Sequence, residues 1–205
     1  MTSRTIAVVS AGLSVPSSTR LLADRLSAAS VDALAERAVD ATVTVVELRE
    51  HARDLADNLV TGFPSPRLRE SVESVVGADG LIAVTPVFAA SYSGLFKTFF
   101  DVLDKDVLTG TPVLLGATGG TARHSLTLEH AMRPLFTYLH ATVVPTAVYA
   151  ATEDWGAADD GSTTLAARIE RAAGELADLV TLRSSTTAHD PFEDPTPFET
   201  LLRGG

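Results

Sequence analysis

The sequence predicts an α/β fold, a three-layer sandwich in which a five-stranded parallel sheet carries helices on both faces. Three observations lead to this prediction. Short apolar runs alternate with longer segments of helical period along the chain. These runs are continuously apolar, which is typical of strands buried on both faces. The 205 residues are enough for one well-filled domain and few for two.

The predicted strands are β-branched runs that end at a turn residue. The first run, TIAVVS, is interrupted at Gly12, and the third, GLIAVT, stops at Pro86 because proline cannot donate to a ladder. The fourth, PVLLGA, ends at Gly119 and Gly120. We expect strands over residues 5–10, 42–48, 80–85, 112–117 and 142–149.

The predicted helices show apolar residues at intervals of three and four. Leu22, Leu26, Ala29 and Ala33 share one face of the first helix. The last helix repeats this spacing at Leu165, Ile169, Ala172, Leu176 and Leu179. We expect helices over residues 17–38, 67–76, 93–103, 124–140 and 163–182, and an irregular segment around Gly62, Pro64 and Pro66.

The domain is expected to span residues 1–183, followed by an extended C-terminal tail over residues 184–205. The tail is polar and contains several Pro and Gly residues. Two interpretations stay open: a frayed terminus, or docking on a partner subunit through Phe192, Phe198 and Leu201.

Composition excludes several classes of function. A net charge of −10 without clustered Lys and Arg argues against a nucleic-acid partner. The chain has no cysteine, so disulfides, thiolate catalysis and iron–sulfur clusters are excluded. The apolar runs are too short for a signal peptide or a membrane span, so we expect no membrane association and a cytoplasmic protein. The five histidines are scattered, and we expect surface or helix-packing roles and no metal site.

The loop after the first strand has the composition of a phosphate site. Ligands of open parallel sheets bind at the carboxyl ends of the strands. Between Ser10 and Arg20 lie the hydroxyls of Ser14, Ser17, Ser18 and Thr19, next to a helix N-terminus whose free N–H groups attract anions. The loop lacks the lysine of a P-loop and the three glycines of a dinucleotide fingerprint, which favours a terminal monophosphate. Alternatively, Ser17 or Ser18 only caps the helix.

Two further loops reach the same edge of the predicted sheet. Pro86 withdraws backbone from the ladder, and Val87 and Phe88 offer an apolar surface for a planar ring, unless Phe88 is simply a core residue. After the fourth strand, Thr118, Gly119 and Gly120 permit close backbone approach to a ring, unless they form an ordinary turn. Three unusual loops at three neighbouring strand ends predict one shared ligand site.

These loops closely resemble those of the NADPH-dependent FMN reductases of the flavodoxin-like superfamily. The resemblance covers residues 4–182 and rests on the Ser-rich loop, on the motif PVFxxSYSGxxKxxxD that ends at Asp101, and on Ala117-Thr118-Gly119-Gly120. It implies the flavodoxin-like strand order 2-1-3-4-5. It also implies FMN as cofactor, NADPH or NADH as hydride donor, and no catalytic side chain, because the flavin carries the hydride chemistry.

The resemblance also implies roles for individual residues. Ser10, Ser17, Ser18 and Thr19 are expected on the phosphate, Pro86, Val87 and Phe88 beside the ring, and Thr118, Gly119 and Gly120 near its pyrimidine side. In the reductases of two-component monooxygenase systems a Tyr at the start of the helix forms a π-bulge and packs near the flavin across a subunit interface. Tyr92 is expected in that place, in a homodimer or homotetramer that supplies reduced FMN to a separate monooxygenase.

In one respect the sequence departs from the family pattern. The Arg frequent in the first half of the phosphate loop is missing, and Leu13 to Val15 stand in its place. Arg20 is a possible substitute, and Arg123 is a candidate partner for the 2′-phosphate of NADPH. Three other functions stay open: a quinone, azo-dye or metal-ion reductase with bound FMN, a flavodoxin-like electron carrier, and a flavin-free binding module.

Overall fold

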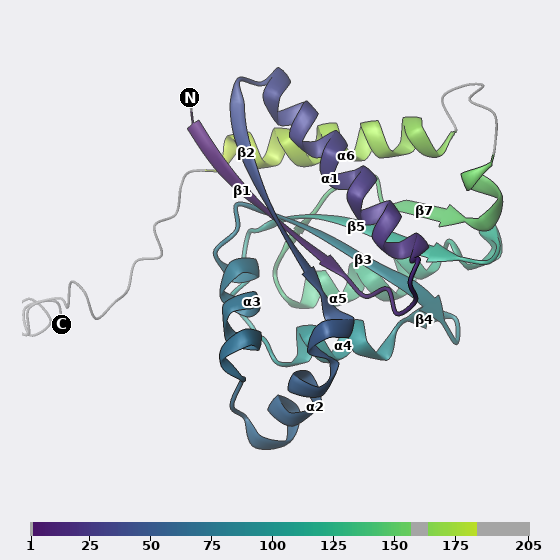
Figure 1. The fold of residues 1–205 in the computed structure, drawn as a ribbon. Helices are drawn as coiled ribbons and strands as arrows, with labels where there is room; N and C mark the ends of the chain where they lie inside the picture. Colours follow the sequence, from purple (N-terminus) through teal and green to yellow (C-terminus); the bar gives the residue numbers. More distant parts are fainter. Residues whose placement is uncertain (1, 157–163, 184–205) are drawn as a thin grey trace, which may run out of the picture.

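The central sheet of the computed structural model, which describes residues 2–156 and 164–183, has the predicted order (Figure 1). The main path runs β2-β1-β3-β5-β6, and every pair on it is parallel. The strands are β1 (Thr2–Ser10), β2 (Val39–Glu47), β3 (Gly80–Phe88), β4 (Ser91–Tyr92), β5 (Pro112–Gly119), β6 (Thr142–Val143) and β7 (Val148–Ala151). β4 is a two-residue strand off this path, so the five main strands, counted without it, have the order 2-1-3-4-5. The predicted flavodoxin-like order is therefore confirmed.

The predicted fifth strand is divided into two pieces. Both β6 and β7 pair with β5, and residues 144–147 between them leave the ladder at Pro145. Side chains bind some of the backbone groups that the ladder leaves unpaired here. Arg133 donates to the carbonyls of Val144 and Pro145 (both 3.1 Å). Glu175 accepts the N–H of Thr146 at 2.7 Å. The continuous strand expected over residues 142–149 was therefore wrong in this detail, because proline cannot donate within a ladder.

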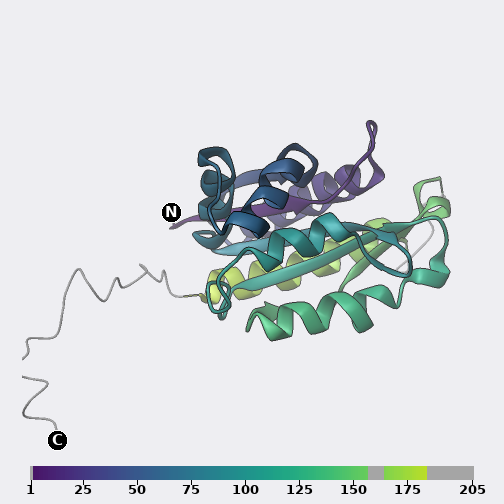
Figure 2. The same cartoon turned by 90° about the horizontal axis from the view of Figure 1, so that it is seen from below.

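The helices cover both faces of the sheet (Figures 1 and 2). α1 (Ser18–Glu36) and α6 (Leu165–Leu182) lie side by side on one face. The other face carries α2 (Ala52–Thr61), α3 (Pro66–Val76), α4 (Gly94–Asp101) and α5 (Arg133–Tyr138). The buried faces predicted for the first and last helices are confirmed at Leu22, Leu26, Ile169 and Leu176.

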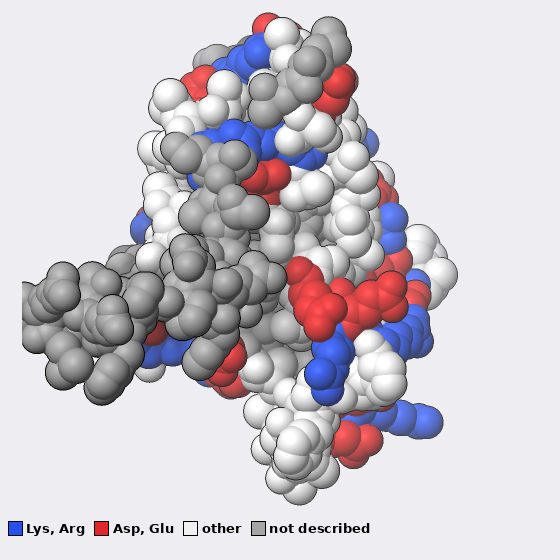
Figure 3. Space-filling model, turned by 90° about the vertical axis from the view of Figure 1, so that its left-hand side faces the viewer, with Lys and Arg blue, Asp and Glu red and all other residues white. Residues whose placement is uncertain are grey.

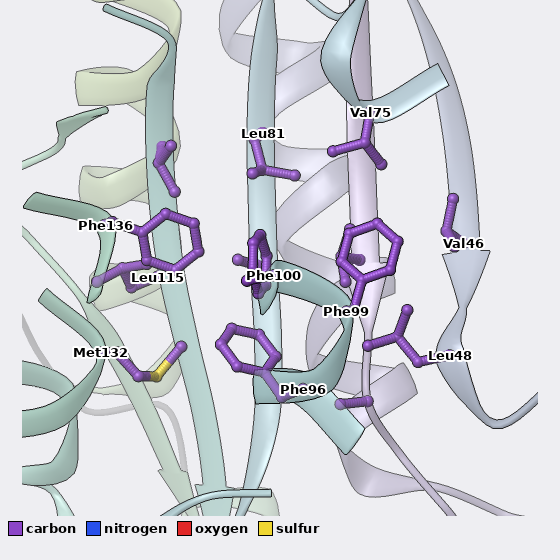
Figure 4. Packing of buried hydrophobic residues seen from close by; sticks show 14 of the residues in the cluster. Val46, Leu48, Val75, Leu81, Phe96, Phe99, Phe100, Leu115, Met132 and Phe136 are labelled. Atoms are coloured by element: carbon purple, nitrogen blue, oxygen red, sulfur yellow. The ribbon is translucent and has the colours of Figure 1, made fainter. Parts of the chain in front are cut away.

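The sheet divides the core into two clusters because successive side chains of a strand point to opposite faces. In β3, Leu81 and Ala83 belong to one cluster and Ile82 and Val84 to the other, and all four are fully buried. On the face covered by α2 to α5, the rings of Phe96 and Phe100 on α4 contact Phe136 on α5 (Figure 4). The centroid of Phe100 lies 4.8 Å from each of the other two.

Helix α2 lies in the stretch that the sequence predicted to be irregular. The helix ends at Gly62, whose left-handed φ of 77° and N–H bond to the carbonyl of Asn58 form a helix cap. Of its residues only Leu55 and Asn58 are buried, so the apolar pattern is too sparse to reveal a helix. The sequence predicts a loop at Gly62, although glycine is also the usual residue at a helix C-terminus.

The segment predicted as one helix over residues 124–140 is composite. A 3-10 turn (Ala122–His124) and a π-turn (Leu128–Met132) precede α5. Pro134 has no N–H to donate to the carbonyl of His130, four residues earlier, so the α-helical ladder is broken here. Instead, the N–H of Arg133 bonds five residues back, to the carbonyl of Leu128.

Strand β3 continues past Pro86, where the prediction ended it. The ladder with β1 stops at Ser10 opposite Val84, and β5 alone pairs with Pro86, through Thr118. The missing N–H of Pro86 therefore costs no hydrogen bond to β1, because the ladder with β1 has already ended. β3 then turns back as a short antiparallel hairpin with β4.

Charged side chains bind the amino edge of the sheet to its neighbours. Arg4 pairs with Asp79 at 3.0 Å, and Arg183 donates to the carbonyls of Ala78 and Asp79 (both 3.1 Å). Figure 3 shows basic and acidic groups interspersed on the face at the left of Figure 1. Within the described residues, no helix has the length and apolar character to cross a bilayer.

The aromatic cluster provides a test of the core. Phe96→Ala removes a fully buried ring, and we expect the free energy of unfolding to fall by about 3–5 kcal/mol. Phe63→Ala is the matched control, because that ring is 78 % exposed. Urea denaturation followed by circular dichroism measures both variants. Equal stability losses for the two would contradict the packing described.

Candidate functional site

A pocket of about 540 Å³ opens at the carboxyl edge of the sheet, where the three loops singled out in the sequence meet. We call it the carboxyl-edge pocket. Its volume is in the usual range for small-molecule sites. Its lining residues are Leu13, Ser14, Ser17, Ser18, Thr19, Pro86, Val87, Phe88, Thr118, Gly119, Gly120, Thr152 and Trp155.

The Ser-rich loop delivers the N-terminus of α1 to this pocket. The Ser17 hydroxyl accepts the N–H of Arg20 at 3.2 Å, so the capping role considered for this residue is confirmed. Gly12 permits this cap, because a Cβ there would lie 2.1 Å from the Ser17 Oγ. The first backbone bond of the helix runs from Leu21 N–H to Ser17 carbonyl at 3.0 Å. The earlier N–H groups, those of Ser18 and Thr19, therefore have no intrahelical acceptor.

One buried hydrogen bond joins the first loop to the third. The hydroxyls of Thr19 and Thr118 lie 2.8 Å apart and are buried, although 99 residues separate them in the chain. The bond fixes the first turn of α1 against the end of β5. The Ser18 hydroxyl, in contrast, is on an exposed residue at the pocket wall.

The hairpin of β3 and β4 forms the second wall. Phe88 is 48 % exposed, so the interpretation of this residue as core is wrong. The turn residues Ala89 and Ala90 have φ of 48° and 63°, a left-handed conformation that is strained for alanine and common near functional sites. Lys97 pairs with Asp101 one turn along α4, consistent with a solvated side chain.

Thr85 anchors this hairpin to α4. Its hydroxyl accepts the N–H of Ser93 at 3.0 Å, and the Ser93 hydroxyl in turn accepts the N–H of Phe96 at 3.2 Å as the helix cap. Both residues are buried. The strand end and the helix start are therefore held together beneath the pocket wall.

The third wall combines Thr118, Gly119 and Gly120. A Cβ on Gly119 would lie 2.1 Å from the Tyr149 hydroxyl, so only glycine fits there. That hydroxyl donates to the carbonyl of Thr121 at 2.8 Å. Burial, and to a lesser extent the charge of Asp154, raises the pKa of Tyr149, which keeps it a neutral donor.

The pocket has a fourth wall that sequence reasoning missed. Trp155 and Thr152 lie on a 3-10 turn (Thr152–Trp155) after β7. Asp154 in this turn accepts from Arg168 at 2.6 Å and from the N–H of Ala151 at 2.7 Å. The Arg25 guanidinium lies 5.1 Å from the centre of the Trp155 ring, a cation–π contact. The available signal was that this turn follows the fifth strand, whose carboxyl end lies at the same edge.

Two of the predicted cofactor residues do not line the pocket. Ser10 ends β1 and is 1 % exposed. Tyr92 lies in β4 instead of at the start of α4, opposite Val87, and its ring packs 5.8 Å from that of Phe96. The π-bulge expected at Tyr92 is not there, and the π-turn of the described residues is at Leu128–Met132.

The pocket wall carries no Lys or Arg among the described residues. Arg20 lines a separate hollow, where it pairs with Glu47 and with Asp24 at 2.7 Å. The hydrogen bond that Arg20 donates to Asp24 is the main reason that the pKa of Arg20 is raised. Arg20, the candidate substitute cation, is therefore paired with two carboxylates and lies outside the wall of the carboxyl-edge pocket. An anion in the pocket would be bound by hydroxyls and helix N–H groups instead.

The histidines divide into separate environments. His51 is buried against Ser71, and burial lowers its pKa. His140 contacts Asp106 at 3.2 Å. His124 and His130 line one groove beside the carboxyl-edge pocket. His189, like the tail over residues 184–205, lies outside the described residues.

The chain matches the family model described as NADPH-dependent FMN reductase over residues 4–156. It is 38 % identical to FMN reductase (NADPH) of Pseudomonas aeruginosa over 87 % of this chain and 94 % of that protein. It is equally 38 % identical to the NADH-dependent FMN reductase SfnE of Pseudomonas putida, over 82 % and 88 %. The crystal structure of an oxidoreductase from Corynebacterium diphtheriae is similar, with a TM-score of 0.86, 49 % identity, and 90 % and 100 % of the two chains covered.

The fold, the three loops at one edge and these matches agree. The family model includes residues of every strand of the sheet, and the relative from Pseudomonas aeruginosa covers 87 % of the chain. The chain belongs to the NADPH-dependent FMN reductase family.

Proposed function

We propose that this chain transfers hydride from NAD(P)H to FMN and that the carboxyl-edge pocket binds the flavin. The observation that carries the proposal is the convergence of three loops, from the ends of β1, β3 and β5, on one pocket. Family membership supports hydride transfer to FMN as the reaction. The pocket supports the carboxyl edge of the sheet as the flavin site.

The phosphate end of FMN fits the start of α1. Ser14 and Ser18 offer hydroxyls on the wall, and the N–H groups of Ser18 and Thr19 precede the first helical bond. The positive end of a helix of 19 residues supplies the charge that the missing Arg does not. Ser17 and Thr19 have structural bonds as well, so their contribution is to hold this turn in place.

The ring end fits between the hairpin and the third loop. Val87 is half-buried and Phe88 is half-exposed, so both present apolar surface to the pocket. Gly119 and Gly120 add backbone without side chains. Trp155 extends the wall on the side of β7.

When bound, FMN supplies the ring that accepts the hydride. The side chains of the protein hold the flavin in position and exclude water from it. The bond between Thr19 and Thr118 fixes the phosphate wall relative to the ring wall, and Thr85 with Ser93 fixes the hairpin. The apolar side chains of Val87 and Phe88 would exclude water from the side of the ring that they cover. No side chain is required to move a proton.

We further propose that reduced FMN leaves for a separate monooxygenase and that the chain forms a homodimer or homotetramer. The open pocket, with Phe88 exposed at its rim, supports release. The contact of Tyr92 with flavin across a subunit interface and the cytoplasmic location also stay predictions.

The phosphate assignment is tested at Ser18. We expect Ser18→Asp to weaken FMN binding by roughly two orders of magnitude, because a carboxylate would face the phosphate. An acidic residue in the first turn of a helix is favourable, so the fold should persist. Trp155 is the only tryptophan of the chain and lines the pocket, so quenching of its fluorescence measures the affinity.

Two controls make this test specific. In Ser18→Asn the new side chain has the size of Asp without its charge, so this variant should bind FMN with an affinity near that of the unmodified chain. Riboflavin has no phosphate, so its affinity should be the same in all three proteins. Unchanged FMN affinity in Ser18→Asp would place the phosphate elsewhere.

The role of flavin as a substrate is tested by kinetics. We expect NAD(P)H oxidation to rise with free FMN and saturate, and the protein to lose flavin on gel filtration. A rate independent of added FMN, with flavin retained on the protein, would indicate a prosthetic group and a different acceptor. Absence of NAD(P)H oxidation with FMN present would favour an electron carrier.

A further inference from the structure

A second groove lies beside the carboxyl-edge pocket, on the other side of the β3–β4 turn. Its volume is about 290 Å³, and its walls include Ala90, Arg123, His124, Leu126, Thr127 and His130. We call it the Arg123 groove. Thr127 closes one side by donating to the carbonyl of Ala90 at 3.3 Å. The groove therefore lies between the hairpin and the segment that follows β5.

The Arg123 groove gathers nitrogen donors without a carboxylate. Arg123, His124 and His130 are exposed, and no Asp or Glu is among the described lining residues. Within the described residues Arg123 has no ion-pair partner. The nearby Glu129 is bound to Arg133 by two bonds of 2.7 and 3.0 Å. In a chain of net charge −10, this is a local concentration of basic side chains, whose potential favours an anion.

The broken helix places His130 in this groove. His130 lies within the π-turn Leu128–Met132, which precedes Pro134. The neighbours Leu128 and Met132 are buried in the core cluster under α4 and α5, so the turn is held from beneath. π-turns within helices are rare, and those that occur often lie at functional sites.

The Arg123 groove and the carboxyl-edge pocket are adjacent but distinct. Gly120 on the pocket wall is three residues from Arg123, a span of about 10 Å at most. On the hairpin, Phe88 faces the pocket and Ala90 the groove. The phosphate end proposed for FMN is at α1, which packs on the opposite face of the sheet from the π-turn. The phosphate proposed at α1 therefore does not occupy the Arg123 groove.

We propose that the Arg123 groove binds the 2′-phosphate of NADPH. The inference rests on the proposed function, which brings the nicotinamide to the flavin ring. A guanidinium binds a phosphate with two parallel hydrogen bonds, and the imidazoles of His124 and His130 add N–H donors. The 2′-phosphate is the one group that NADPH has and NADH lacks, so these residues determine the choice between the two nucleotides.

The test compares both nucleotides in Arg123→Gln and His130→Gln. We expect the KM for NADPH to rise about tenfold in Arg123→Gln and less in His130→Gln, with kcat unchanged. The KM for NADH should stay the same in both. Arg53→Gln is the matched control, since Arg53 is exposed on α2 and has no ion pair among the described residues. Melting temperatures confirm that each variant is folded.

A binding experiment tests the groove without turnover. Adenosine 2′,5′-bisphosphate should bind the unmodified chain in calorimetry and bind Arg123→Gln about tenfold more weakly. Adenosine 5′-monophosphate should not distinguish the two proteins. If neither nucleotide is oxidised by the unmodified chain, the proposed function fails, and the calorimetry still decides the groove. Equal losses for NADPH and NADH, or an unchanged affinity for the bisphosphate in Arg123→Gln, would overturn the inference.

Discussion

The burial of three adjacent parallel strands on both faces is the constraint on which the rest of the structure depends. In β1, β3 and β5, neighbouring residues such as Leu81 and Ile82 are both fully buried, on opposite sides. Each face must therefore be covered by helices, and each strand must reach the next through a crossover. As a result the strands end together at one edge. The loops that follow them converge there, whatever their separation in sequence.

Convergence becomes a defined site because a few buried polar bonds hold the loops in register. The bond of Thr19 to Thr118 connects α1 to β5, and Thr85 with Ser93 connects β3 to α4. Both pairs are removed from water, where a hydroxyl without a partner would be costly. The walls of the carboxyl-edge pocket are thus fixed from beneath, while Ser18 and Phe88 stay exposed toward a ligand. The Arg123 groove uses the same hairpin from its other side.

Sequence reasoning succeeded where residue type and order are informative. The continuous apolar runs indicated the strands, and the family motif indicated their order. It failed where one residue has two interpretations. Gly62 predicts a loop but ends a helix, and Pro145 divides a segment whose apolar pattern predicts one continuous strand. Tyr92 was placed on α4, but its pairing with Val87 puts it in a hairpin that depends on two alanines with positive φ. Alanine gives no local signal of that conformation.

The sequence by itself determined the fold class, the buried helix faces and the three loops that form a common edge, because these follow from periodicity and chain order. Only the tertiary structure decided which side chains face the pocket. It added Trp155, left Ser10 buried outside the pocket wall, and paired Arg20 with Glu47 in a hollow beside the pocket. It also brought Arg123, His124 and His130 into one groove. These outcomes depend on side-chain direction and on partners distant in the chain, and neither is encoded in local spacing.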